Sequence, residues 1–177
     1  MKISYLVTCK NETLELLQLI EKLKTHIDFV TPNDEVVILD DFSNNEDTKK
    51  ILAKAKSYGF TVVQHSLNKN FSEHKNYGSK RCVGDYIVQL DADEYLYPVL
   101  LSNMHELLES NPTVELYRVP RVNIVRGMTE KDVTMWGWNL SILPENNPII
   151  ETIIDDASEE YAFLKKNNLI ISEEIAG

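Results

Sequence analysis

The most informative stretch of the chain is Tyr86-Ile-Val-Gln-Leu-Asp-Ala-Asp-Glu94, where an apolar run leads directly into acidic residues. A short apolar run with β-branched residues is typical of a buried strand. Ligand sites in open α/β sheets lie at the carboxyl ends of parallel strands, so Asp91, Asp93 and Glu94 would face a ligand. Carboxylate oxygens suit Mg²⁺ or Mn²⁺, which commonly bridge a protein to a substrate diphosphate. The stretch therefore predicts a metal-assisted enzyme that acts on a nucleotide-linked substrate.

These acidic residues also have a purely structural interpretation, in which they cap the helix that we expect to begin at Pro98. They precede Pro98 by several residues, and closely spaced carboxylates repel one another unless a cation binds. The metal-binding interpretation is therefore favoured.

Strand-like and helix-like patterns alternate along the first two thirds of the chain. The expected strands cover residues 2–8, 35–39, 60–64 and 85–90, with extended chain over 114–125. The expected helices begin at Asn11, near Ser43, at Ser72 and at Pro98. Gly59 fits the left-handed position after the second helix. This alternation predicts an α/β fold with a mostly parallel central sheet flanked by helices.

The pattern weakens beyond about residue 126, where we expect a terminal helix over residues 158–168 and a short strand over 169–171. The chain has 177 residues, a length that fits a single domain.

The composition excludes some classes of partner. The formal net charge of −10 argues against nucleic acid and anionic membrane surfaces, whereas a diphosphate remains compatible if a metal supplies positive charge. No apolar run approaches the ~20 residues of a membrane span. Cys9 and Cys82 fit no zinc spacing, which favours free thiols. The N-terminus resembles a strand more than a signal peptide, so we expect a cytoplasmic protein.

Polar clusters follow several of the expected strands. Thr8–Glu12, Asp40–Ser43 and Asp91–Glu94 each follow a strand and should meet at one end of the sheet, while His74–Tyr77 lies in the helix before the fourth strand. Taken singly, Asp40 and Asp41 are also good turn residues, and Lys75 would by default be a solvated side chain. The isolated His26, His65 and His105 receive no role.

The four clusters, with their flanking residues, resemble the N-terminal half of the family 2 glycosyltransferases of the GT-A fold. The matching blocks are Val7-Thr-Cys-Lys-Asn-Glu12, Val37-Ile-Leu-Asp-Asp-Phe-Ser43, His74-Lys-Asn-Tyr-Gly78 and Gly84-Asp-Tyr-Ile-Val-Gln-Leu-Asp-Ala-Asp-Glu94. The resemblance implies a nucleotide-diphospho-sugar transferase fold. It also implies one domain over residues 1–177, with 1–110 as the nucleotide-sugar-binding half and 111–177 as a shortened acceptor half.

The resemblance further implies roles for individual residues. Asp93 would bind the metal most directly and Asp91 would act beside it, so these two are the predicted metal-binding and catalytic residues. Asp41 would accept a hydrogen bond from the base, and Lys75 stands where many members carry Arg. The full predicted substrate-binding set is Thr8, Lys10, Asn11, Asp40, Asp41, Lys75, Asp91, Ala92 and Trp138. For Trp138, together with Trp136, a core-filling role is the favoured alternative to a platform for a sugar ring.

No acidic motif identifies the general base that an inverting member needs. The candidates lack spacing support, and surface exposure without function is the alternative for each: Glu130, Asp132, Glu151, Asp155 and Asp156. Whether the reaction inverts or retains configuration stays open.

The sequence thus predicts a transferase that uses Mn²⁺ or Mg²⁺ and a nucleotide sugar, with UDP favoured, and an acceptor that is a glycan, lipid or protein. A nucleotide-sugar- or glycan-binding module with little or no turnover is the first alternative. A sugar-phosphate nucleotidyltransferase is a lesser one, because the Thr8–Glu12 loop lacks the glycines of a phosphate loop. The apolar tail Leu169–Ile175 leaves a homo-oligomer open.

Overall fold

The computed structural model describes residues 1–119, 122–124, 130–135 and 170–172. The chain divides into two units. The first consists of Met1–Leu96 and Leu101–Glu109, and the second of Tyr97–Leu100 and Ser110–Gly177. All four polar clusters of the sequence lie in the first unit. The expectation of a single domain over residues 1–177 stays a prediction.

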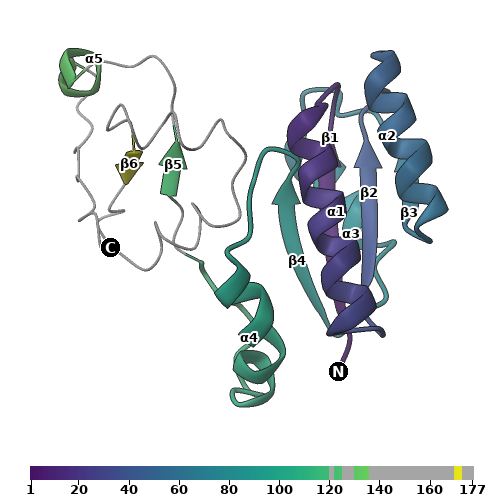
Figure 1. The fold of residues 1–177 in the computed structure, drawn as a ribbon, viewed down its shortest axis with the longest axis vertical. Coiled ribbons are helices and arrows are strands. Elements are labelled where there is room, and N and C mark those ends of the chain that lie inside the picture. Colours follow the sequence, from purple (N-terminus) through teal and green to yellow (C-terminus); the bar gives the residue numbers. More distant parts are fainter. Residues whose placement is uncertain (120–121, 125–129, 136–169, 173–177) are drawn as a thin grey trace. The chain divides into compact units, whose positions relative to one another are not determined.

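Among the described residues, the first unit is built on a four-stranded parallel sheet (Figure 1). Its strands are β1 (Ile3–Cys9), β2 (Glu35–Asp40), β3 (Thr61–Gln64) and β4 (Tyr86–Asp91). The order β3-β2-β1-β4 puts β1 between β2 and β4. The register pairs Cys9 with Asp40 and Thr8 with Asp91, so the carboxyl ends of these three strands lie side by side.

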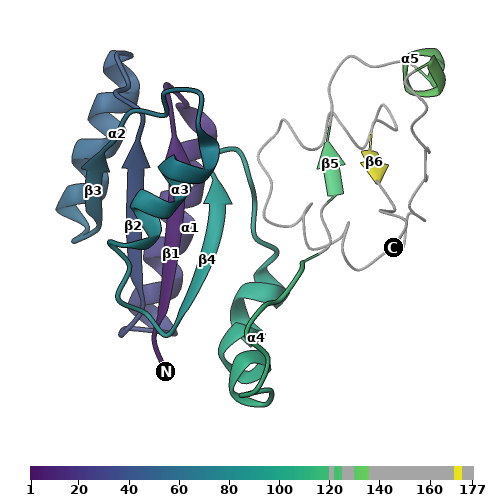
Figure 2. The same ribbon diagram turned by 180° about the vertical axis from the view of Figure 1, so that it is seen from behind.

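Helices cover both faces of this sheet (Figures 1 and 2). They are α1 (Leu14–Phe29), α2 (Glu46–Ser57) and α3 (Phe71–Ser79), and α4 (Pro98–Glu109) follows β4. Helices α1 and α2 lie on one face, and α3 lies on the other, as the view from behind shows. The predicted α/β fold with a parallel central sheet is therefore confirmed.

Burial on both faces explains why the central strands are almost continuously apolar. On the side of α3, the buried side chains of Leu6, Val37 and Leu39 form a cluster against which Tyr77 packs. The helix approaches closely at Gly78, where an added Cβ would lie 2.8 Å from Leu6 Cδ1. A tightly packed sheet and helix hold the loops at the strand ends in fixed positions.

The predicted start of the first helix at Asn11 is wrong. Helix α1 begins at Leu14, with Thr13 in the N-cap position. Asn11 has a left-handed φ of 66°, and its side-chain oxygen accepts hydrogen bonds from a different loop instead of from α1.

The predicted start of the third helix at Ser72 is also wrong. Helix α3 starts at Phe71, and the side chain of Asn70 caps it by accepting a hydrogen bond of 3.0 Å from Glu73 N. Local sequence favours both Asn70 and Ser72 as caps, so only the path of the chain decides between them. By contrast, the left-handed conformation predicted for Gly59 is confirmed, with a φ of 87°.

In the second unit the described elements are β5 (Val122–Ile124), α5 (Glu130–Met135) and β6 (Ile170–Ser172). The strands β5 and β6 pair in antiparallel fashion, which confirms the short strand predicted near residues 169–171. Helix α5 was not predicted, because six mostly polar residues carry no readable periodicity. The helix predicted over residues 158–168 lies outside the described residues. Within the described part of the chain, no helix combines the length and apolarity of a membrane span.

Candidate functional site

The carboxyl ends of β1, β2 and β4, with the loops that follow them, form what we call the carboxyl end of the sheet. Two backbone hydrogen bonds continue the pairing past the strands: Asp41 N donates to Cys9 O at 2.9 Å, and Ala92 N donates to Thr8 O at 3.0 Å. The first, second and fourth polar clusters of the sequence are thereby brought together, as the parallel topology predicts.

Asp41 and Lys10 form an ion pair at this end, with 2.6 Å between Lys10 Nζ and Asp41 Oδ2. The other carboxylate oxygen accepts a hydrogen bond of 2.9 Å from Leu67 N. The hydrogen bond from Lys10 is the main reason why the pKa of Asp41 lies below its ordinary value. The Asp41 side chain is 8% exposed and that of Lys10 is 57% exposed, so a fixed carboxylate is held by a cation that remains in contact with water.

Asp91 is the centre of a second group of contacts. Its Oδ1 accepts a hydrogen bond of 2.6 Å from Thr8 Oγ1 and lies 3.0 Å from Lys75 Nζ. Lys75 comes from α3, so it joins the helix on one face of the sheet to the end of β4. The default interpretation of Lys75 as a solvated side chain is therefore wrong, since it pairs with a carboxylate of the predicted site.

Asp93 differs from these two aspartates. It lies on the turn after β4, is exposed, and makes no hydrogen bond or ion pair with any residue in the described part of the chain. Ala92, between the two acids, is buried at 2% exposure and anchors the turn through its backbone. The carboxylate of Asp93 is thus the available oxygen ligand beside the Asp91 group.

Metal binding by Asp93 and Asp91 stays a prediction. The described residues contain no group of three or more His, Cys, Asp or Glu side chains arranged to hold a metal. Mg²⁺ in particular is usually bound by one or two carboxylates, with substrate phosphates and water as the other ligands. Asp93 and Asp91 would supply the protein's share of such a site.

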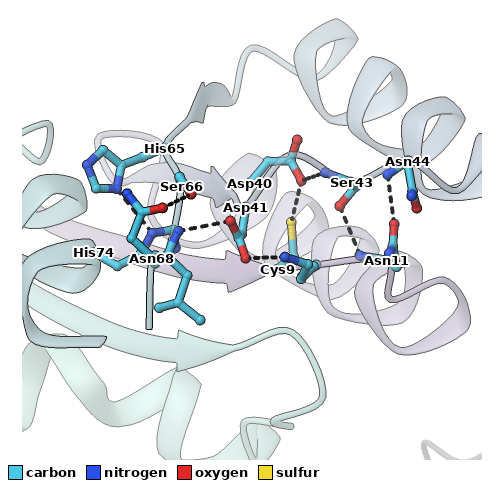
Figure 3. A network of polar contacts seen from close by, with 12 residues as sticks. Cys9, Asn11, Asp40, Asp41, Ser43, Asn44, His65, Ser66, Asn68 and His74 are labelled. Carbon is cyan, nitrogen blue, oxygen red and sulfur yellow. Dashed lines mark hydrogen bonds and ion pairs between the residues drawn. The ribbon is translucent and has the colours of Figure 1, made fainter. Parts of the chain in front are cut away.

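Asp40 has a different environment from its neighbour Asp41, although the sequence placed both in the substrate-binding set. It is 1% exposed, and its carboxylate accepts hydrogen bonds of 3.0 Å from both Ser43 N and Gln64 Nε2. Cys9 Sγ also lies 3.9 Å from Asp40 Oδ1 (Figure 3). The residue anchors the loop that carries Asp41, and burial raises the pKa of the Cys9 thiol, which favours an unreactive form.

Asn11 fastens the loop after β1 to the loop after β2 (Figure 3). Its Oδ1 accepts hydrogen bonds from Asn44 N at 2.8 Å and Asn45 N at 3.0 Å, and its own N–H donates to Ser43 Oγ at 2.9 Å. Phe42, in the same loop, is 57% exposed with a left-handed φ of 51°. The two loops form one rigid support, with an aromatic side chain held in water.

His65, to which the sequence assigned no role, lies near this site together with His74 of the His74–Tyr77 cluster. The Nδ1 atoms of His65 and His74 lie 3.2 Å apart, and the ring of His65 stacks on Tyr77 with centroids 4.0 Å apart. His74 is buried at 4% exposure, and Figure 3 shows the pair beside Asp41. His74 lies four residues before Gly78 on the buried face of α3. This helical spacing was the sequence signal that could have predicted the burial of His74. No local pattern indicated its partner.

The candidate general bases are not part of the first unit. Glu130 and Asp132 lie in helix α5 of the second unit. The remaining acidic candidates and both tryptophans lie outside the described residues: Glu151, Asp155, Asp156, Trp136 and Trp138.

Comparison with protein families gives a match over most of the chain. The model of the family described as "Glycosyl transferase family 2" matches residues 4–169. The chain therefore belongs to the family 2 glycosyltransferases, and the resemblance drawn from its four sequence blocks is confirmed.

The individual relatives are distant and longer. An uncharacterized glycosyltransferase of Haemophilus influenzae is 26% identical over 118 residues, which cover 67% of this chain and 38% of that protein. The structure of S. aureus TarS 1-349 in complex with UDP-GlcNAc matches with a TM-score of 0.53 and 22% identity, covering 98% of this chain and 49% of that one.

A mannosyltransferase of Pyrobaculum calidifontis in complex with GDP-Man and Mn²⁺ also has a TM-score of 0.53, with 23% identity, covering 67% of this chain and 35% of that one. These structural similarities support the GT-A fold that the sequence predicted. The chain spans about half or less of the length of each of these three relatives.

Proposed function

We propose that this chain is the donor-binding part of a glycosyltransferase. The enzyme moves a sugar from a nucleoside-diphosphate sugar, with UDP favoured, to an acceptor. The observation that carries the proposal is the grouping of Asp41–Lys10, Asp91–Lys75 and the exposed Asp93 at one end of a parallel sheet. Ligands of open α/β sheets bind at this end.

In this proposal the nucleoside lies over the loops after β1 and β2. The carboxylate of Asp41 is held rigidly by Lys10 and Leu67 N, so it can accept a hydrogen bond from a base N–H without reorganising. Thr8 supports the neighbouring Asp91, and Asn11 and Asp40 hold the loops in place. These two residues therefore contribute to binding through the backbone that they fix.

The diphosphate would lie near Lys75 and Asp93. Negative charge grows on the diphosphate as its bond to the sugar breaks, and a fixed positive charge close by stabilises it. Lys75 Nζ, with its side chain 31% exposed, provides such a charge. Asp93 and Asp91 would hold Mn²⁺ or Mg²⁺, which when bound supplies a Lewis acid for the departing diphosphate.

Two structural relatives support the choice of donor class without deciding the base. One was solved with UDP-GlcNAc and the other with GDP-Man and Mn²⁺. Both ligands are sugars linked to a nucleoside diphosphate, which is the class that the site of this chain fits. The acceptor, whether glycan, lipid or protein, and the general base belong to the part of the protein beyond the described site.

A ligand screen tests this proposal. Thermal unfolding would be followed with UDP-, GDP-, dTDP- and CMP-sugars, each with and without Mn²⁺, because a bound ligand raises the midpoint by mass action. We expect a UDP-sugar to give the largest shift and to need Mn²⁺. The matched control is Asp28→Asn, an exposed aspartate paired with Lys24 on α1, which should respond like the wild type.

The same samples also distinguish an enzyme from a binding module without turnover. Release of UDP from the responding donor, measured over hours with Mn²⁺, should occur in the wild type and be lost in Asp93→Asn. Binding without any release, with or without candidate acceptors, would favour the binding module. No shift with any of the four donors would overturn the proposal.

A further inference from the structure

The loop between β3 and α3, residues 65–70, contacts both aspartates of the Asp40-Asp41 pair. His65 N donates to Asp40 O at 3.1 Å, and Leu67 N donates to Asp41 Oδ1 at 2.9 Å. The loop is sharply turned, since Asn68 and Lys69 are both left-handed, with φ values of 46° and 60°. Such a conformation persists only where surrounding contacts enforce it.

The imidazole pair provides such a contact. His65 is the first residue of the loop and His74 lies in α3, so their 3.2 Å hydrogen bond joins the start of the loop to the helix that follows it (Figure 3). The backbone of Ser66 favours the protonated form of His74. The imidazole contact thus fixes His65, two residues before the Leu67 N–H that binds Asp41.

A hydrogen bond between two Nδ1 atoms depends on the number of protons. One nitrogen must carry a hydrogen and the other must offer a lone pair, which a neutral or singly charged pair satisfies. When both rings are protonated, two N–H groups and two positive charges face each other, and the bond is lost. Burial is the main reason why the pKa of His74 lies below its usual value, followed by the nearby His65.

The surroundings of the pair do not offset this repulsion fully. Asp41 favours protonation of His74, but its carboxylate is already paired with Lys10. Lys75 disfavours a second charge, and Tyr77 covers the other face of His65 without a charge of its own. The neutral or singly protonated pair is therefore the form that holds the loop.

We propose that His65 and His74 are a proton-sensitive positioning pair for Asp41, so that donor binding weakens when both imidazoles become charged. The proposal rests on the donor site proposed above, and it adds a regulation of that site. Neither histidine contacts the donor. They act through the loop, because Leu67 N keeps Asp41 Oδ1 in place only while the loop is held. Donor affinity should be full above about pH 6.5 and fall as the pH drops below the pKa of a free imidazole.

The test uses two substitutions of the half-buried His65, which leave the buried His74 intact. His65→Asn offers an amide N–H to His74 and cannot become charged. His65→Phe keeps a ring against Tyr77 but has no hydrogen-bonding nitrogen. Donor affinity would be measured by calorimetry with a UDP-sugar and Mn²⁺ from pH 8 to pH 5. His105→Asn, at the opposite end of the sheet, is the control.

The wild type and the His105→Asn control should lose about fivefold in affinity between pH 7.5 and pH 5, the factor for one hydrogen bond of ~1 kcal/mol. His65→Asn should bind like the wild type at pH 7.5 and show no such loss. His65→Phe should bind weakly at every pH. An identical pH profile in His65→Asn and wild type would overturn the proposal, as would affinity that rises on acidification.

The backbone amide of Leu67 provides a readout that needs no donor. In the wild type its NMR signal should shift, and its protection from hydrogen exchange should fall, with a midpoint below about pH 6.5. In His65→Asn it should stay unchanged. If no donor binds at any pH, the proposed function fails while this amide still decides whether the pair holds the loop. If the NMR signal and the exchange protection of the Leu67 amide do not change with pH in the wild type, the proposed role of the pair is contradicted.

Discussion

At each end of the parallel sheet, an aspartate is paired with a basic side chain. At the carboxyl end Lys10 holds Asp41, and the lysine is 57% exposed. At the amino end His105 Nε2 lies 2.8 Å from Asp34 Oδ2, and the side chain of Asp34 is 0% exposed. Both carboxylates are buried, but Lys10 is more exposed than His105, whose side chain is 26% exposed. The more exposed Lys10 can rearrange around a ligand, whereas the fully buried Asp34 holds the fold together.

The amino end shows further signs of a structural role. Asp34 also accepts a hydrogen bond of 2.9 Å from Ile3 N, which ties β2 to the start of β1. His26 is buried at 7% exposure, and burial holds its pKa below the ordinary value. Among the described residues, its Nε2 atom has no hydrogen-bond partner. The polar side chains at this end are buried in the interior. Their removal should therefore affect stability more than donor binding.

The largest expected effect is at the amino end. Asp34→Ala leaves Ile3 N and His105 without their buried partner, and such a loss costs about 3 kcal/mol. Urea unfolding should show this decrease in the free energy of unfolding. Donor affinity of the remaining folded protein should be unchanged. A stable variant with weakened donor binding would reverse the roles given to the two ends.

Asp41→Asn tests the carboxyl end in the same way. The variant keeps an acceptor for Leu67 N but loses the charge that pairs with Lys10 and meets the base. We expect donor affinity to fall about tenfold, as for a hydrogen bond to a charged group, with less than about 1 kcal/mol lost in stability. Calorimetry and urea unfolding on one preparation would compare the two effects.

The pH dependence of stability adds a check on Asp41. Because Lys10 lowers its pKa in the folded protein, the ion pair stabilises the fold above the unfolded pKa of about 3.9 and this stabilisation is lost as the pH falls through the folded pKa. The loss of stability on acidification should therefore be smaller in Asp41→Asn than in the wild type. Parallel curves would mean that the pair contributes nothing to the fold.

His26 predicts a pH effect from the amino end. Its folded pKa is lowered by burial, so the neutral ring stabilises the fold above about pH 6.5 and the contribution declines as the pH falls below that value. The free energy of unfolding should decrease between pH 7 and pH 5, and the slope should be shallower in His26→Gln. An equal slope in the variant would assign the acid sensitivity to other groups.

The smallest expected effect concerns Phe42, next to Asp41. A left-handed φ is unfavourable for Phe, so Phe42→Gly should stabilise the protein by about 0.5–1 kcal/mol even though Gly loses more chain entropy. A gain in stability with weaker donor binding would show that the carboxyl end keeps a strained residue for its ligand. A loss of stability would mean that the exposed ring makes contacts that the fold needs.

Sequence patterns were sufficient to predict which polar clusters meet at the carboxyl end, because their positions follow from the strand order. Apolar runs located β1, β2 and β4, and parallel pairing then brought Thr8 to Asp91. Helix starts were less predictable, since Asn11 and Thr13 are equally acceptable caps until the loops meet. The His65–His74 pair and the Asp34 group depend on how helices pack on the sheet, which no local pattern encodes.

The most direct measurement of the central claim is the coupling between metal and donor. Calorimetric titration of the UDP-sugar would be done with and without Mn²⁺, in the wild type and in Asp93→Asn. We expect Mn²⁺ to raise the affinity of the wild type at least about tenfold, and of the variant hardly at all, because Asp93 supplies the available carboxylate. Equal gains in both proteins, or no gain in either, would contradict the account.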